Sequence, residues 1–387
     1  EREIEAFQSE EYWTVEAKLK KGKNAFTADV THVRGKKLAL HSEAETKALT
    51  DDLARQDFAV KEVKRSERRK KAAPPFTTSS LQQDAARKLG FTSGRTMMIA
   101  QQLYEGVVLG RQGATGLITY MRTDSTRISN LAVDEARSYL SETYGRGYVP
   151  QRPNIYAMGK KAQDAHEGIR PTSIVRTPAD VEPYLNRDQL RLYTLIWQRF
   201  AASQMSAAVY DTIAAQIAAG DYQLRAHGSK LKFKGYTAVY VGAEIAKKEK
   251  DTLLPELEAG DALALSDLKP EQHFTEPPPR YNDASIVKTL EEMGIGRPST
   301  YAPIIETIQK RGYVERREKQ FRPTELGFIV TDMLEEYFKD IVDVKFTANL
   351  EGELDEVADG TLDKNDLLRK FYDPFDETLK QAEDVIG

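Results

Sequence analysis

The sequence predicts an α+β protein of several domains, in which an antiparallel β domain is interrupted by one helical domain and followed by a second. Apolar and polar residues alternate from 11 to about 60 and again from 209 to 279, the period of strands with one buried face. Helical periodicity runs through 130–205 and returns after residue 280. At 387 residues the chain is long enough for about two to four domains with separate cores.

The ranges 11–76 and 206–279 are expected to form one β arch or hinge domain, because a helical insertion with both ends close together is a natural hinged unit. A helix is expected across Ser42 to Ala54. The basic run from Lys61 to Lys71 precedes two prolines and allows two interpretations. It is either a solvated edge strand that leads into a linker or an arm that contacts phosphates.

The first helical range, 77–205, is expected to begin with a helix-turn-helix. After Thr77 a serine-to-glutamine spacing predicts a capping box and a helix that stops at Gly90. A second helix is expected from Thr96 to about Tyr104, and it is followed by a glycine-rich, hairpin-like stretch and a short strand. Residues 130–205 are expected to be helical, with Trp197 and Phe200 at core spacing.

The range 280–387 repeats this order. A helix is expected over Ile286 to Ile295 and a second from Ser299 to about Arg311, and a hairpin then completes a winged-helix pattern. This shared order predicts that the two helical domains are a divergent internal repeat of a winged-helix-like unit. Residues 1–10 are expected to end a preceding helical segment.

Composition excludes several classes of protein. The net charge of −4 argues against a uniformly basic nucleic-acid coat but allows a local basic groove. The absence of cysteine excludes disulfides and thiolate metal sites and fits a reducing compartment. The first residues contain no initiator methionine, signal peptide or bilayer-length apolar run, so we expect an internal piece of a larger cytoplasmic protein.

A tyrosine within the stretch from Gly116 to Thr126 is the strongest chemical signal. A short apolar strand is expected to carry Tyr120 into a group of polar and charged side chains, and Arg122 would share its strand face. A nearby cation favours the phenolate over the phenol, whose pKa is ordinarily ~10. Tyr120 is therefore a candidate nucleophile, although a half-buried strand tyrosine before a helix cap would have the same local pattern.

A second constellation, Gln163 to Pro171, combines His166, Glu167 and Arg170. Arg170 stands where a zinc-binding H-E-x-x-H motif needs its second histidine, so the pattern disfavours a metalloprotease. Histidine, carboxylate and guanidinium together suit phosphate handling. A purely structural loop histidine is the alternative.

Together these segments resemble type IA DNA topoisomerases, in which a tyrosine attacks a DNA phosphodiester and becomes joined to the 5′ phosphate. Met121 beside the tyrosine is similar to the bacterial topoisomerase I branch. The resemblance covers nearly the whole chain and follows the family's block order, at 75–83, 96–106, 116–126, 163–171, 272–278 and 294–301.

The resemblance assigns roles to single residues. It implies that Tyr120 is the nucleophile, that Arg122 orients the scissile phosphate, and that Asp124 pairs with His166 or fixes its orientation. Residues implied to line the site are Gln101, Tyr104 and Glu105, and those implied to hold the single strand are Arg170, Arg297, Ser299 and Thr300.

The resemblance also implies an open toroid fragment whose β arch opens a gate for strand passage. Single-stranded and negatively supercoiled DNA would be the partners of a monomeric, nucleoid-associated cytoplasmic enzyme without membrane contact. The family holds Mg²⁺ in an N-terminal TOPRIM domain that would precede Glu1, so no cofactor and no metal ligand are expected here. The acidic run Glu351 to Asp355 is a poor substitute because it lies on a helical pattern. Zinc ribbons are absent as well.

The expected reaction needs no ATP, because a phosphotyrosine diester conserves the energy of the broken bond, and no Walker motif occurs. The fragment alone is expected not to relax DNA. Two other classes stay open. A non-catalytic single-stranded DNA-binding scaffold would not need Tyr120, and a transcription regulator with paired winged helices would bind duplex DNA by sequence.

Overall fold

The computed structural model describes residues 1–156, 166–240 and 252–386. Contacts divide the chain into two compact units, which are described separately. The sheet unit consists of Arg2–Ala72 and Met205–Pro279, and the helical unit consists of Glu1, Ala73–Gln204 and Arg280–Gly387. The two helical ranges that the sequence separates thus fall into one unit by contacts. No helix in the described ranges is long and apolar enough to cross a membrane.

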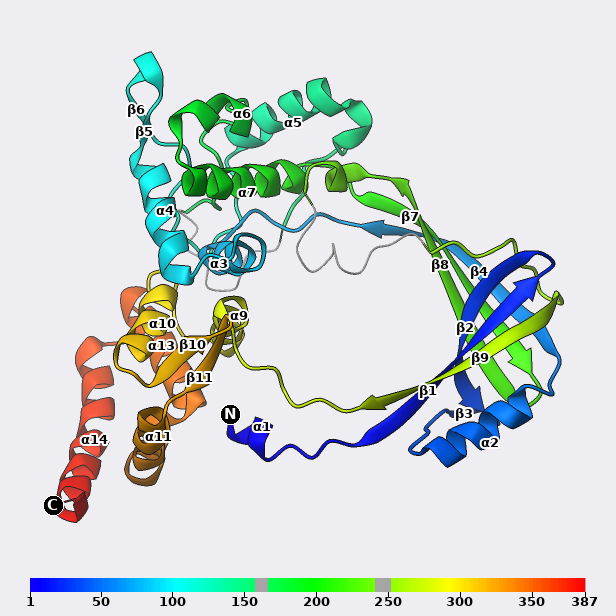
Figure 1. Cartoon of the computed structure of the whole chain (residues 1–387). Coiled ribbons are helices and arrows are strands. Elements are labelled where there is room, and N and C mark those ends of the chain that lie inside the picture. The colour runs from blue at the N-terminus through cyan, green and yellow to red at the C-terminus, as the bar shows by residue number, and fades with distance from the viewer. Residues whose placement is uncertain (157–165, 241–251, 387) are drawn as a thin grey trace. The chain divides into compact units, whose positions relative to one another are not determined.

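The sheet unit is built on one antiparallel sheet of seven strands (Figure 1). The strands follow the order β1-β9-β4-β7-β8-β2-β3, and β1 also pairs with β2, so the row closes on itself and leaves few free edges. Strands from before and after the helical insertion therefore share the sheet. Their bounds are β1 Glu11–Lys21, β2 Asn24–Val33, β3 Lys36–Lys37, β4 Phe58–Lys70, β7 Ala208–Ala219, β8 Tyr222–Phe233 and β9 Ala262–Phe274.

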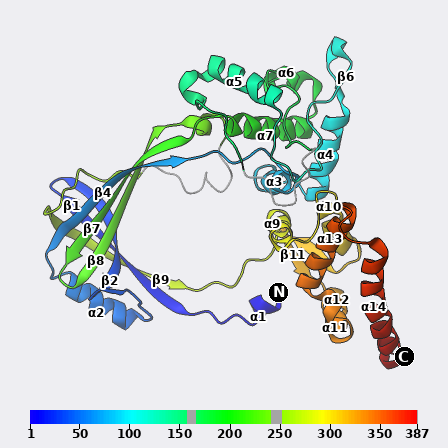
Figure 2. The same cartoon turned by 180° about the vertical axis from the view of Figure 1, so that it is seen from behind.

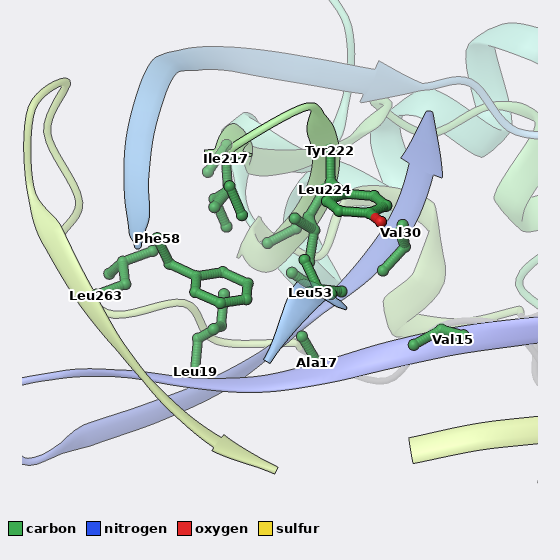
Figure 3. Packing of buried hydrophobic residues seen from close by; sticks show 14 of the residues in the cluster. Val15, Ala17, Leu19, Val30, Leu53, Phe58, Ile217, Tyr222, Leu224 and Leu263 are labelled. Atoms are coloured by element: carbon green, nitrogen blue, oxygen red, sulfur yellow. The ribbon is translucent and has the colours of Figure 1, made fainter. Parts of the chain in front are cut away.

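Alternate residues of these strands form an apolar core (Figure 3). In β1 the buried positions Val15, Ala17 and Leu19 alternate with charged residues that face outward. Helix α2, Glu43–Leu53, begins at the N-cap Ser42, as the sequence predicts, and buries Leu53 in this core. Such continuous apolar packing makes the sheet unit a scaffold.

The basic half of β4 is solvated, as the first interpretation predicts. Its exposed residues pair with β7 as far as Lys70, whereas pairing with β9 is confined to Phe58 and Ala59. The alternative role, a phosphate-contacting arm, stays a prediction.

In the helical unit, the first helix pair differs from the prediction at both starts. Helix α3, Thr78–Asp84, is capped by Thr77, whose hydroxyl accepts from the Ser80 N–H while Ser80 Oγ accepts from the Thr77 N–H. The predicted serine-to-glutamine box is therefore wrong, because the first extended residue with a hydroxyl takes the cap. The chain continues as a π-helical turn to Gly90, which ends it as predicted. Helix α4, Ser93–Glu105, begins three residues earlier than expected because Thr92 caps it.

The range 130–205 is less helical than predicted. Helices α5 Asn130–Tyr144, α6 Pro178–Val181 and α7 Arg187–Ser203 are present, but the described residues between 149 and 177 contain no helix. Glycines and prolines interrupt this stretch, which overrides the apolar periodicity. Trp197 and Phe200 are buried, as expected, and Trp197 donates its indole N–H to the Ile174 carbonyl at 2.8 Å.

The second helix pair and its hairpin follow the predicted order. They are α9 Asp283–Met293, α10 Tyr301–Lys310, β10 Val314–Arg317 and β11 Gln320–Pro323. The first pair is likewise followed by a small hairpin, β5 Val107–Val108 with β6 Ala114–Thr115. The chain closes with α11 Glu325–Tyr337, α12 Lys339–Val342, α13 Val344–Ala358 and α14 Lys364–Ile386.

The two helix pairs pack on each other, α3 against α9 and α4 against α10 (Figure 2). Ser79 donates to Glu291 across the first contact at 2.7 Å. In the second contact, Gly94 of α4 lies against the carboxylate end of Glu306 of α10. This packing brings the segment after α4 and the turn before α10 to one pocket.

Candidate active site

Tyr120 lies on a short, irregular segment that begins against the end of α4. Gly116 lies so close to the helix that a Cβ would be 2.8 Å from the Tyr104 carbonyl, and the Leu117 N–H donates to the Leu103 carbonyl at 2.8 Å. Leu117 and Met121 are fully buried on either side, whereas 43% of Tyr120 is exposed. The buried neighbours therefore fix the backbone while the phenol faces outward.

The predicted strand at Tyr120 is wrong. Only an isolated bridge joins Ile118 to Pro171, and the chain bends at Met121 and Arg122. Thr119 ends the pairing, because its hydroxyl takes the Arg170 N–H at 3.0 Å. A side chain has replaced the backbone acceptor that a strand would supply, so Arg122 does not share a strand face with Tyr120.

Beyond the bend, one buried hydroxyl, that of Thr78, holds the backbone by hydrogen bonds. Thr78 Oγ donates to the Met121 carbonyl at 2.6 Å and accepts from the Thr123 N–H at 2.9 Å. The Thr78 N–H also donates to the Thr123 carbonyl at 2.9 Å. Tyr120 is thus held between Thr119 on one side and Thr78 of α3 on the other.

The phenol lies in a mixed aromatic and charged environment. Its ring centroid is 5.4 Å from that of Tyr104 and 6.1 Å from that of His166, both edge-on. An open pocket of about 320 Å³ adjoins it, lined by Tyr120, Arg122, Thr123, Asp124, His166, Arg297, Pro298, Ser299 and Asp355. The structure therefore brings together most of the residues that the sequence selects.

Arg122 and Asp124 both line this pocket. Arg122 Nη1 donates to the Ser299 carbonyl at 3.4 Å. Among the described residues no hydrogen bond joins Asp124 to His166, so that pairing stays a prediction. The Gln163-Asp-Ala part of the histidine constellation lies outside the described residues.

Arg170 is occupied within its own loop. Its Nη2 lies 2.9 Å from Glu167 Oε2, its Nη1 donates to the Pro171 carbonyl, and only 12% of its side chain is exposed. Burial raises the pKa of Glu167, but the hydrogen bonds from Arg170 and Ser129 outweigh burial and hold it below its usual range. Arg170 therefore fixes the loop beside His166, and its predicted strand contact is untested.

Gln101, Tyr104 and Glu105 share the last turns of α4. Gln101 Nε2 donates to Glu105 Oε1 at 2.5 Å, one helical turn away. Of the three, only Tyr104 contacts Tyr120 through its ring. None of them lines the pocket described above.

The turn before α10 forms the opposite wall. The Arg297 N–H donates to Thr300 Oγ1 at 2.8 Å, which closes the turn that contains Ser299. The Arg297 guanidinium pairs with Glu351 and Asp355, both at 2.8 Å. Sequence reasoning considered these carboxylates only as a weak metal site, and their i, i+4 spacing predicts a shared helix face but no particular partner.

The residues that the structure describes around the pocket do not form a set of ligands for a divalent metal. Among the described residues no group of three or more His, Asp or Glu side chains is placed to hold an ion. The carboxylates that line the pocket are Asp124 and Asp355, and Asp355 is engaged by Arg297.

Two comparisons with known proteins each cover most of the chain. A family model described as DNA topoisomerase matches residues 1–369. The full-length topoisomerase I of Thermotoga maritima is similar in structure, with a TM-score of 0.84 and 38% sequence identity. The match covers 97% of this chain and 60% of that one.

Proposed function

Because the chain belongs to the type IA DNA topoisomerase family, we propose that Tyr120 breaks one DNA strand and stays joined to it. The observation that supports this role is the exposed phenol of Tyr120, which stands on a rigid segment beside a pocket that also contains Arg122 and His166. A nucleophile needs both access and a fixed direction of approach.

In the proposed step, the Tyr120 oxygen attacks a phosphodiester phosphorus in line with the leaving oxygen. The phenol loses its proton, the bond from phosphorus to the 3′ oxygen breaks, and that oxygen takes up a proton. Tyr120 then carries the 5′ phosphate. Arg122 stabilises the charge that develops on the phosphoryl oxygens, and the attack of the freed 3′ hydroxyl reverses the step without ATP.

We propose single-stranded and negatively supercoiled DNA as the substrate and strand passage through an opened toroid as the outcome. The sheet unit would serve as the arch, and the protein would act as a monomer near the nucleoid. Ser299, which lines the pocket, would offer its hydroxyl and backbone to the strand, and Thr300 would support it by closing the turn through its bond with the Arg297 N–H.

The family generally depends on Mg²⁺, and the described residues offer no site for it. We therefore propose that a TOPRIM domain beyond these residues supplies the metal. The isolated chain should bind single-stranded DNA weakly, with an affinity that falls as salt rises. It should not relax supercoiled plasmid at any magnesium concentration, and relaxation dependent on Tyr120 would contradict this division of labour.

The test compares two exposed tyrosines in the complete enzyme. Tyr120→Phe should abolish covalent protein–DNA adducts and leave noncovalent binding nearly unchanged. Tyr281, which is 46% exposed and does not line the pocket, provides the matched control Tyr281→Phe. Adducts that persist in Tyr120→Phe would show that Tyr120 is not the nucleophile. Binding without any adduct in the unchanged enzyme would favour the non-catalytic scaffold.

A further inference from the structure

Arg297 directs four of its five guanidinium N–H donors to protein acceptors at the pocket wall. Its Nη1 donates to Glu351 Oε2 at 2.8 Å and to the Gly296 carbonyl at 2.7 Å. Its Nη2 and Nε bind both oxygens of Asp355, at 2.8 and 3.3 Å. A guanidinium has five N–H donors, so these bonds leave one on Nη2 for any other acceptor.

The two carboxylates lie on one face of α13, one helical turn apart. Glu353, between them, turns to a different partner, Lys370 of α14. The acidic run thus contains two carboxylates that face Arg297 and one that does not. The two carboxylates offset the positive charge of Arg297 and weaken its attraction for a phosphate.

Arg297 also holds the turn that faces Tyr120. Its Nη1 lies 3.2 Å from the Gly294 carbonyl at the end of α9. Gly296 has φ +80°, and a Cβ there would be 2.9 Å from the Tyr301 ring, so only glycine lets this turn close. The turn directs the Ser299 carbonyl to Arg122, the cation next to the nucleophile.

A phosphate could bind Arg297 through the single remaining N–H, or it could displace one of the two carboxylates, Glu351 or Asp355, from the guanidinium. Displacement would also release the turn that positions Ser299, so binding there would disorder the site that it is meant to fill. Arg122 makes one hydrogen bond to a carbonyl and forms no ion pair among the described residues, so it is better placed to meet the strand.

We propose that Glu351 and Asp355 are positioning residues, which hold Arg297 at the centre of the 294–300 turn so that Ser299 orients Arg122 beside Tyr120. Arg297 then acts through this turn rather than as a ligand of the DNA phosphates. The inference rests on the proposed function, since the step being positioned is cleavage by Tyr120, and it revises the strand-holding role that the sequence suggests for Arg297.

The first experiment removes one negative charge from α13 at three positions. Asp355→Asn and Glu351→Gln keep an acceptor oxygen, and Glu353→Gln is the matched control because it makes the same change on the same helix. In the complete enzyme, cleavage of a single-stranded oligonucleotide should slow about tenfold in kcat for the first two, with KM unchanged, and stay normal in the control. Thermal unfolding should show that all three variants fold.

Affinity separates positioning from competition. If the carboxylates merely competed with phosphate for Arg297, Asp355→Asn would free the guanidinium and bind the oligonucleotide several-fold more tightly than Glu353→Gln. We expect equal affinities for these two variants. Tighter binding by Asp355→Asn, or cleavage as fast as in the control, would overturn the proposal.

A conservative replacement tests the fork of Arg297. Lysine keeps the charge but cannot bridge Glu351, Asp355 and a carbonyl together. Arg297→Lys should therefore slow cleavage as Asp355→Asn does, and the double variant should be no slower than the slower single one. Normal cleavage by Arg297→Lys would show that only a positive charge is needed and would refute positioning. Absence of any Tyr120 adduct in the unchanged enzyme would remove the proposed function as well, which distinguishes the two failures.

Discussion

The two units bury different kinds of residue. In the sheet unit the buried cluster is apolar and closed by strand pairing, and Thr46 is the one buried polar residue that the structure describes there. In the helical unit buried polar residues are frequent around Tyr120, among them Thr78, Thr123 and Ser125. Apolar contacts give stability without direction, whereas buried hydroxyls fix the direction of a backbone. The sheet unit is therefore a scaffold, whereas the helical unit fixes the orientation of the Tyr120 segment.

The largest effect on stability is expected in the sheet core. Leu224 is fully buried in it (Figure 3), and Leu224→Ala should lower the free energy of unfolding by about 2–5 kcal/mol through lost transfer energy and a cavity. Urea unfolding measures the loss. Leu131→Ala, at a side chain that is 83% exposed, is the control and should have little effect. A loss below about 1 kcal/mol, close to the scale of surface substitutions, would show that this apolar core does not stabilise the sheet unit as expected.

The largest effect on chemistry is expected at Arg122. Arg122→Ala should raise the barrier to strand cleavage by about 2–4 kcal/mol, the scale of one lost oxyanion-type donor, and leave unfolding nearly unchanged. Single-turnover cleavage in the complete enzyme measures the change. An unaltered cleavage rate would show that Arg122 is not the charge that stabilises the transition state.

Two buried threonines, one in each unit, allow the two units to be compared by the same substitution. Thr78→Val removes the hydroxyl that joins Met121 to Thr123, which should cost about 1–3 kcal/mol of stability and also slow cleavage, because the Tyr120 segment loosens. Thr46 donates to the Ser42 carbonyl within its own helix, so Thr46→Val should cost stability alone. Equal cleavage rates in the two variants would mean that the hydroxyl at Thr78 holds the fold and not the site.

The smallest effect concerns alkaline pH. Burial raises the pKa of Tyr301 to about 12, and burial with a hydrogen bond to Asp52 raises that of Tyr222 to about 12. Unfolded tyrosine has a pKa of ~10. Between that pH and the folded pKa values, the unfolded chain binds fewer protons than the folded chain, so the free energy of unfolding falls as pH rises. Both contributions are fully present below pH ~10. Urea unfolding at several pH values should show a shallower decline for Tyr222→Phe, and an identical decline would contradict this origin.

Sequence reasoning reaches the parts of this molecule that are local. The cap at Ser42, the alternation in β1 and the stop at Gly90 each depend on a few neighbouring residues, and the structure contains them. The predicted strand at Tyr120 failed because Thr119 bonds through its side chain to Arg170, a residue far along the chain. The selection of Tyr120 and Arg122 came from a motif rather than from geometry.

The partners of Arg297 could not be predicted from the sequence for the same reason. Glu351 and Asp355 follow it by more than fifty residues, and only the packing of α13 near the end of α9 brings them to it. A helical i, i+4 pair of carboxylates is common on solvated surfaces, so its spacing alone could not identify a partner. Long-range ion pairs of this kind need the fold before they can be seen.

Mass spectrometry of the denatured complete enzyme, after reaction with an oligonucleotide, shows which residue forms the bond to DNA. Tryptic cleavage after Arg111 and Arg122 releases Tyr120 on the peptide from Gln112 to Arg122. We expect the nucleotide mass on this peptide, attached through a 5′ phosphate to Tyr120. An adduct on any other residue, or one attached through a 3′ phosphate, would contradict the account.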